Sequence, residues 1–290
     1  MIHESKNWNL QSVICVLCVC VWVCVSGTAH AQQRPLVTED PETIGSGRIL
    51  LEGGLSLDKD QTSSAHGITG DIARLATFGV SVGISPFAEV QIDGGLVQRI
   101  DVTGLVTPHV PLPGATQLAV GDRASSVDDL IVATKIRLTS EGASSPAVGV
   151  RFGTKLPTAS PDKGIGLGTT DFFASFLAAK TVQSVRTVGN VGLIVLGNPV
   201  TPRDPATTLG IGLSVARALT NEFEVVGEIN GRLTPFEKIV PAGLESRGVL
   251  RLAGRYTYAM LRLDLGLLAG ITSRDPSFGI SAGATYVITR

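Results

Sequence analysis

The chain has 290 residues and a net charge of −1, and only 17% of its residues are charged. This balance, without a basic block, excludes the phosphate-neutralising surface that nucleic-acid binding requires. No stretch after Ala31 reaches the roughly 18 apolar residues that predict a membrane-spanning helix, so we expect neither a nucleic-acid partner nor a helical membrane protein.

The first 31 residues have the features of a secretory signal peptide. Lys6 lies in a short polar start, residues 13–25 are apolar, and Ala29 and Ala31 form a small-x-small cleavage site. The apolar run is shorter than the about 20 residues of a transmembrane helix, and its β-branched valines disfavour the alternative of a buried N-terminal helix. We expect export of the chain and removal of residues 1–31.

All cysteines of the chain precede the expected cleavage site. They are Cys15, Cys18, Cys20 and Cys24. The mature chain would therefore contain no disulfide and no thiolate metal site, and we expect no metal and no cofactor. Residues 32–46 are polar and contain prolines, so we expect a periplasmic lead-in there, followed by a single domain at residues 47–290.

Hydrophobic and polar residues alternate through most of the remaining chain. In the first such run, Ile49, Leu51 and Leu55 share one face and Glu52 lies on the other. The runs are 48–57, 77–84, 88–96, 129–138, 148–156, 171–181, 187–196, 209–216, 223–230, 249–256, 261–268 and 278–288, of which 171–181 and 187–196 are less regular. Alternation with this period predicts twelve β-strands.

The length of the strands and of their connections separates a membrane barrel from a soluble β-sandwich, which shows the same alternation. Soluble strands average about 5–6 residues, whereas these runs are longer and come close to the about 9–11 residues of membrane-spanning strands. Short connections at 85–87, 139–145, 182–186, 220–221 and 258–259 alternate with longer ones at 59–70, 101–126, 157–170, 197–206, 234–245 and 272–277. Outer-membrane barrels have short periplasmic turns and longer outer loops.

We therefore predict an all-β fold: a transmembrane, antiparallel, up-and-down β-barrel of about twelve strands in the bacterial outer membrane. Its expected partners are membrane lipid and the barrel-assembly machinery. Aromatic residues near strand ends would suit the interfacial girdles of such a barrel. They are Phe87, Phe223, Tyr258, Phe278 and Tyr286.

Several short motifs resemble one family of bacterial outer-membrane proteins. They are residues 35–43 with Gly45 and Gly47 before the first strand, the turn 85–90, Gly121-Asp122 ahead of 135–137, and 155–158 leading to Gly166, Gly168 and 171–172. This pattern is similar to the family named for the MetA pathway of phenol degradation. The resemblance implies a transport role linked to aromatic compounds and no catalytic residues. The chain departs from many outer-membrane barrels by ending in Arg290 rather than an aromatic residue, for which Tyr286 could substitute.

Charged residues of the predicted strands fall on the polar, inward face. These candidate lumen residues are Arg48, Glu52, Glu89, Asp93, Arg99, Lys135, Arg137, Arg151, Lys155, Glu224, Glu228, Arg232, Arg251, Arg255, Arg262 and Asp264. One interpretation is a polar lumen that sets selectivity. The other is a set of ion pairs that plugs a narrow barrel, since buried charges need partners and a barrel of about twelve strands has a modest lumen.

The residues give little support for an enzyme. After the signal, the histidines are His66 and His109, both in predicted outer loops, and no Gly-x-Ser-x-Gly nucleophile motif is present. The glycine-rich stretch 164–168 lacks the lysine of a phosphate-binding loop, so we expect a flexible loop. We predict a channel or uptake protein for small solutes, aromatic or hydrophobic ones among them. The alternatives are a structural or adhesive barrel with a plugged lumen and, more remotely, a barrel that hydrolyses lipid.

Overall fold

A computed structural model describes residues 35–107, 117–235, 240 and 242–289. The predicted signal peptide and His109 lie outside the described residues. Among the residues that are described, no helix is long and apolar enough to cross a membrane.

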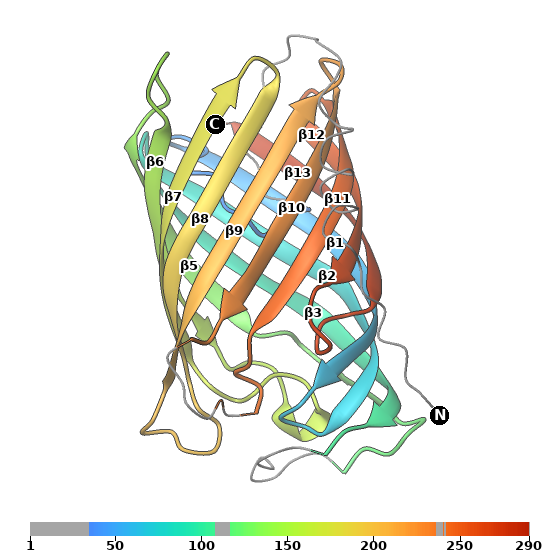
Figure 1. Cartoon of the computed structure of the whole chain (residues 1–290). Helices are drawn as coiled ribbons and strands as arrows, with labels where there is room; N and C mark the ends of the chain where they lie inside the picture. Colours follow the sequence, from blue (N-terminus) through green and yellow to red (C-terminus); the bar gives the residue numbers. More distant parts are fainter. Residues whose placement is uncertain (1–34, 108–116, 236–239, 241, 290) are drawn as a thin grey trace, which may run out of the picture.

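The described chain forms a closed antiparallel barrel (Figure 1). The wall consists of β1 (Arg48–Ser63), β2 (Ile68–Ser85), β3 (Ala88–Leu105), β5 (Leu130–Thr139), β6 (Ala147–Leu156), β7 (Asp171–Val182), β8 (Val185–Leu196), β9 (Ala206–Ala218), β10 (Phe223–Leu233), β11 (Arg247–Tyr258), β12 (Leu261–Gly270) and β13 (Phe278–Thr289). Each strand pairs with its neighbour in the chain, and β1 pairs with β13 to close the ring. The predicted up-and-down barrel is confirmed.

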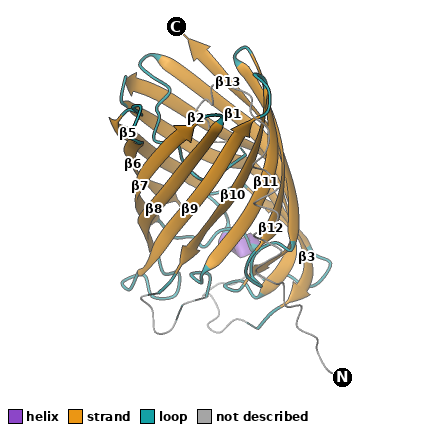
Figure 2. Cartoon of the chain, turned by 45° about the horizontal axis from the view of Figure 1, so that its top comes forward, coloured by secondary structure: helices purple, strands orange, loops and turns teal. Residues whose placement is uncertain are grey.

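Two further elements lie in the long connections. The short strand β4 (Arg123–Ser126) pairs with residues 98–101 of β3, beyond residues 88–93, with which β5 pairs. The 3-10 turn η1 (Pro161–Lys163) lies between β6 and β7. Figure 2 shows the strands as a tilted wall with the single helical turn near one end of the barrel.

The outer surface of the wall is apolar, as the alternation predicts. On β9, Leu213 is 48% exposed while the next residue, Ser214, is 3% exposed. Exposed apolar side chains recur on every long strand of the wall, among them Leu55, Ile92, Leu193, Leu265 and Ile280. A soluble protein rarely exposes such a continuous apolar surface, whereas lipid is its natural solvent.

Aromatic residues mark the end of the barrel with the short turns, which we call the periplasmic end. Phe87, Phe223, Tyr258 and Tyr286 lie at this end of their strands and are exposed. Phe278 is exposed at the opposite, extracellular end, where β13 begins. The aromatic positions chosen from the sequence therefore occupy both rims.

One predicted loop is wrong. Residues 59–70 were expected to form a long connection, but β1 and β2 continue to Ser63 and Ile68 and are joined by a turn at 64–67. Polar residues lie on both faces of this part of the hairpin, for example Gln61 on one face and the paired Thr62 and Thr69 on the other. It therefore lacks the alternation of apolar and polar residues that identified the other strands. Register shifts in the same hairpin interrupt the period further.

The lead-in also differs from its predicted place. Its described part, residues 35–46, hydrogen-bonds to side chains of β3, β5, β8 and β10, which stand around the barrel. One segment can reach all of these strands only from the lumen. It therefore lies inside the barrel, because its backbone and carboxylates find partners on the polar inner face of the wall.

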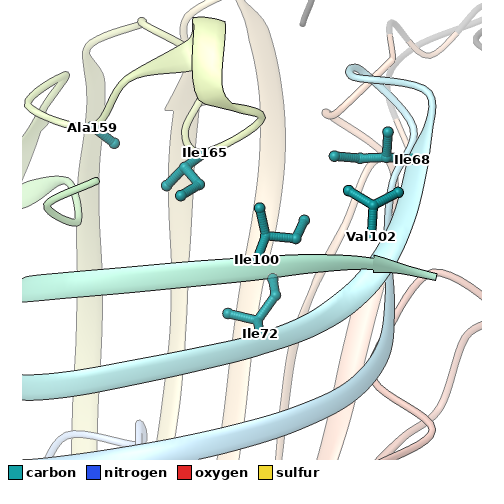
Figure 3. Packing of buried hydrophobic residues seen from close by; sticks show 6 residues of the cluster. All are labelled: Ile68, Ile72, Ile100, Val102, Ala159 and Ile165. Carbon is teal, nitrogen blue, oxygen red and sulfur yellow. The ribbon is translucent and has the colours of Figure 1, made fainter. Parts of the chain in front are cut away.

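At the extracellular end the β6–β7 connection folds inward. Ala159 and Ile165 pack against Ile68, Ile100 and their neighbours on β2 and β3 (Figure 3). Residues 242–246 of the β10–β11 connection do the same, since Leu244 packs with Leu196 and Ala206. The stretch 164–168, expected to be a flexible loop, thus anchors an apolar cluster through Ile165, which is 2% exposed.

Candidate functional site

The site is the lumen together with the segment inside it. We call residues 35–46 the plug. The plug ends at β1, which begins at the periplasmic rim, and its contacts extend from that rim, at Glu89 and Arg186, to the middle of β8 and β10, at Asn190 and Glu228. The plug therefore fills the periplasmic half of the lumen.

Glu39 is the centre of the first group of plug contacts. Its carboxylate lies 3.4 Å from Lys135 Nζ on β5 and 2.9 Å from Arg151 Nε on β6. Lys135 also pairs at 3.0 Å with Glu89 of β3, and all three side chains of this Glu39–Lys135–Glu89 group are at most 6% exposed. The charged amine of Lys135 can be buried because the carboxylates of Glu39 and Glu89 compensate its charge.

Two more plug carboxylates bind arginines. Asp40 accepts hydrogen bonds from Nε and Nη2 of Arg186 at 2.5 and 2.7 Å, which is the two-point geometry of a strong arginine–carboxylate pair. Arg186 also binds Glu141 of the β5–β6 turn at 2.9 Å. Glu42 pairs with Arg137 of β5.

The plug backbone is bound as well as its side chains. The N–H groups of Val37 and Thr38 donate to Glu228 Oε1 at 2.8 and 2.5 Å. Asn190 of β8 exchanges two hydrogen bonds with the Glu39 backbone, accepting at 2.6 Å and donating at 2.7 Å. These contacts satisfy amides that would otherwise be buried without partners.

Glycines of the wall make room for the plug. A Cβ on Gly83 would lie 1.8 Å from the carbonyl oxygen of Gly45, and a Cβ on Gly212 would lie 2.8 Å from Thr38 Oγ1. Gly149 is similarly close to Pro41, with a built Cβ at 3.1 Å from the proline ring. The plug is thus packed against the wall as well as hydrogen-bonded to it.

Fourteen of the sixteen candidate lumen residues face inward. Glu52, Glu89, Lys135, Glu228, Arg255, Arg262 and Asp264 are buried, and Asp93, Arg137, Arg151, Lys155, Glu224, Arg232 and Arg251 are half-buried. Many pair across strands, such as Arg255 with Glu224 at 3.0 Å and Lys155 with Asp129 and Asp171 at 2.8 and 3.1 Å. Arg48 is exposed at the periplasmic rim, where β1 begins.

Arg99 is the candidate that the structure places elsewhere. Its side chain is 47% exposed on the outer face and pairs with Asp101 at 3.1 Å, while Gln98 and Ile100 are buried. At the start of β3 the odd-numbered residues Glu89 and Gln91 face inward, whereas further along the even-numbered Gln98 does. The alternation of inward and outward side chains in β3 is therefore shifted by one residue between Gln91 and Gln98. The neighbouring β2 carries a register shift at the level of Gly54 and Ser56, and β3 follows it.

Sequence reasoning missed the plug residues. Glu39, Asp40 and Glu42 were assigned to a periplasmic segment, although three acidic residues close together before the first strand could have been matched to inward-facing cations. Arg186 was also missed because it was assigned to the short connection 182–186, ahead of the irregular run 187–196. The signal that would have found them is the match between the acidic residues of the lead-in and the inward-facing cations of the strands.

The extracellular half of the lumen has different chemistry. Arg232 donates to the carbonyl oxygens of Glu245 and Gly243 at 3.0 and 2.7 Å, which holds the inward β10–β11 connection. Beside it, the clusters around Ile68 and Leu244 are apolar. Ion pairs lie there as well, since Lys155 binds Asp129 and Asp171 and Arg74 binds Asp58. The extracellular half therefore combines apolar clusters with paired charges.

Ser63 and His66 are the arrangement closest to a hydrolase site. Ser63 Oγ lies 2.7 Å from His66 Nδ1, but both belong to one tight turn and the imidazole is only 5% exposed. Burial lowers the pKa of His66 below its usual value. Among the described residues no carboxylate hydrogen-bonds to His66 in the way a catalytic triad requires, and no group of three or more potential ligands is arranged for a metal.

Known structures share this fold. The sequence matches no protein-family model, and no curated protein is similar to it in sequence. An outer membrane channel of Pseudomonas putida F1 is similar in structure, with 12% sequence identity and a TM-score of 0.61 over 86% of this chain and 98% of the other. The translocator domain of the autotransporter NalP from Neisseria meningitidis is 12% identical, with a TM-score of 0.49 over 83% and 88% of the two chains. The CymD monoaromatic hydrocarbon channel is 10% identical, with a TM-score of 0.42 over 85% and 89%. The fold is that of outer-membrane barrels.

Proposed function

We propose that the mature chain is an outer-membrane channel for small solutes, including apolar and aromatic ones, and that the plug blocks it at rest. The decisive observation is that the plug precedes β1 and that ion pairs and hydrogen bonds hold its described residues against the wall. It can leave the lumen without breaking a hydrogen bond between wall strands. A removable plug in a closed wall is the architecture of a gated passage.

The apolar extracellular clusters support the solute class. Ile68, Ile100 and Ile165 are at most 2% exposed and pack against one another, so an apolar solute would contact them after the inward loop that carries Ile165 moves aside. The neighbour from Pseudomonas putida F1 is itself a channel. The motif resemblance to the phenol-degradation family fits the same proposal. The proposal includes removal of a signal peptide, insertion by the barrel-assembly machinery and residence in the outer membrane.

The test is single-channel recording in a planar bilayer. The mature chain and a variant lacking residues 35–44 would be compared, with the heat-dependent mobility shift of folded barrels as the folding control. We expect brief, rare openings of the full chain and long openings of the deletion variant. A folded deletion variant that never conducts would refute the channel.

A second candidate is a structural or adhesive barrel with a closed lumen. The observation that favours it is that both halves of the lumen are occupied, by the plug and by the inward loops carrying Ile165 and Leu244. This function predicts no conductance from either protein and no change of stability when small solutes are added. The same recordings therefore separate the two candidates.

A further inference from the structure

The wall residues that hold the plug form a carboxylate-binding surface. Lys135, Arg137, Arg151 and Arg186, which we call the cation arc, project into the lumen from β5, β6 and β8. Each of them binds a carboxylate of the plug. From this geometry we propose that the cation arc is the binding site for a carboxylate group of the transported solute, which displaces the plug. The inference rests on the proposed channel function and names its solute class: small organic anions with an apolar body.

The arc is built to recognise carboxylates rather than negative charge in general. Arg186 grips Asp40 through two N–H groups, at 2.5 and 2.7 Å, and Glu39 bridges Lys135 and Arg151. Planar two-point binding of this kind suits carboxylates and phosphates and gives no such match to a spherical anion such as chloride. Inside a partly dry lumen such hydrogen bonds are stronger than in water.

Charge balance explains why an anion is needed for opening. The cation arc pairs with six carboxylates, of which Glu39, Asp40 and Glu42 come from the plug and Glu89, Asp93 and Glu141 from the wall and its turns. Departure of the plug alone would leave Arg137 without its carboxylate and its neighbours with fewer partners. Such cations are costly where they stay shielded from water, so a solute that brings its own carboxylate lowers the cost and a neutral solute does not.

The apolar half of the solute also has a counterpart near the arc. The guanidinium of Arg151 lies over the ring of Phe173, with 4.9 Å between its central carbon and the ring centroid. A cation so placed can bind a carboxylate at its edge while a ring packs beside it. This contact favours an aromatic acid over a small inorganic anion.

The experiment uses the full mature chain in planar bilayers, with benzoate and the neutral benzyl alcohol as probes. We expect benzoate to raise the open probability about tenfold, which corresponds to replacing one charge-assisted hydrogen-bonded pair. Benzyl alcohol at equal concentration should have no such effect. The triple variant Glu39→Gln, Asp40→Asn, Glu42→Gln should open without benzoate, and in a salt gradient its reversal potential should shift towards that of chloride.

A matched triple variant controls for the loss of three charges. Asp122→Asn, Asp162→Asn and Glu222→Gln remove carboxylates that do not contact the cation arc, and this variant should keep the benzoate response of the unmodified chain. Equal opening by benzoate and benzyl alcohol, or a plug-neutralised variant that conducts without anion preference, would overturn the inference and leave the channel intact. Silence of every folded variant would instead remove the channel function itself.

Discussion

Leu213→Arg tests the assignment of the outer face to lipid. Leu213 lies near the middle of β9, opposite Gly189 and Ile229 of the adjacent strands, and its side chain is 48% exposed. If lipid surrounds it, arginine there should lower the free energy of folding by about 2–4 kcal/mol, the cost of that side chain near the bilayer midplane.

The matched control is Leu261→Arg, which makes the same chemical change at a different depth. Leu261 is 40% exposed and begins β12 at the periplasmic rim. Close to the interface, arginine should cost only about 0–1 kcal/mol. Both values come from denaturant titration of the chain refolded into lipid vesicles, with the fraction folded read from the mobility shift. Equal costs at the two depths would show that Leu213 does not face the hydrocarbon core.

Three further changes test the plug and its surroundings. Gly83→Ala places a Cβ 1.8 Å from the Gly45 carbonyl oxygen, so it should displace the plug and lengthen channel openings; unchanged gating would contradict the packing described. Glu228→Gln keeps the shape of the side chain but removes the charge that binds Arg251 and the amides of Val37 and Thr38, and should make the plug accessible to added protease in vesicles where the unmodified plug is protected. His66 has a folded-state pKa lowered from 6.5 by burial, so its contribution to stability is present above pH 6.5 and is lost as the pH falls below it. The protection factors of the 64–67 turn against hydrogen exchange should therefore fall on acidification, and His66→Asn should abolish that fall.

The wall could be predicted because each strand reports its own environment. A strand with lipid on one side and a polar lumen on the other must alternate, and Leu213 with Ser214 shows the pattern without knowledge of any neighbour. The same local rule failed at Arg99, because one register shift in β2 carries over to β3 and inverts the faces that follow. It failed at residues 59–70 because β1 is polar on both faces from Asp58 to Ser63 and a register shift interrupts the period there.

The plug could not be predicted from local pattern. Its partners are remote in sequence, such as Glu228, which lies 191 residues from Val37. Nothing in the periodicity of residues 35–46 distinguishes a segment in the lumen from one in the periplasm. The two interpretations of the inward charges, a selective lumen and a plugged one, prove to describe parts of one arrangement, since Lys135 and Arg151 line the lumen and also bind Glu39.

The measurement that tests the gated channel most directly is conductance with the plug locked in place. The predicted mature chain has no cysteine, and a Cβ on Gly212 would lie 3.5 Å from that of Thr38, within the range of about 3.5–4.5 Å for a disulfide. The double variant Thr38→Cys, Gly212→Cys should be silent when oxidised and should conduct after reduction in the same bilayer. Equal conductance in the oxidised and reduced states, with the disulfide verified by mass, would show that the plug does not gate the barrel.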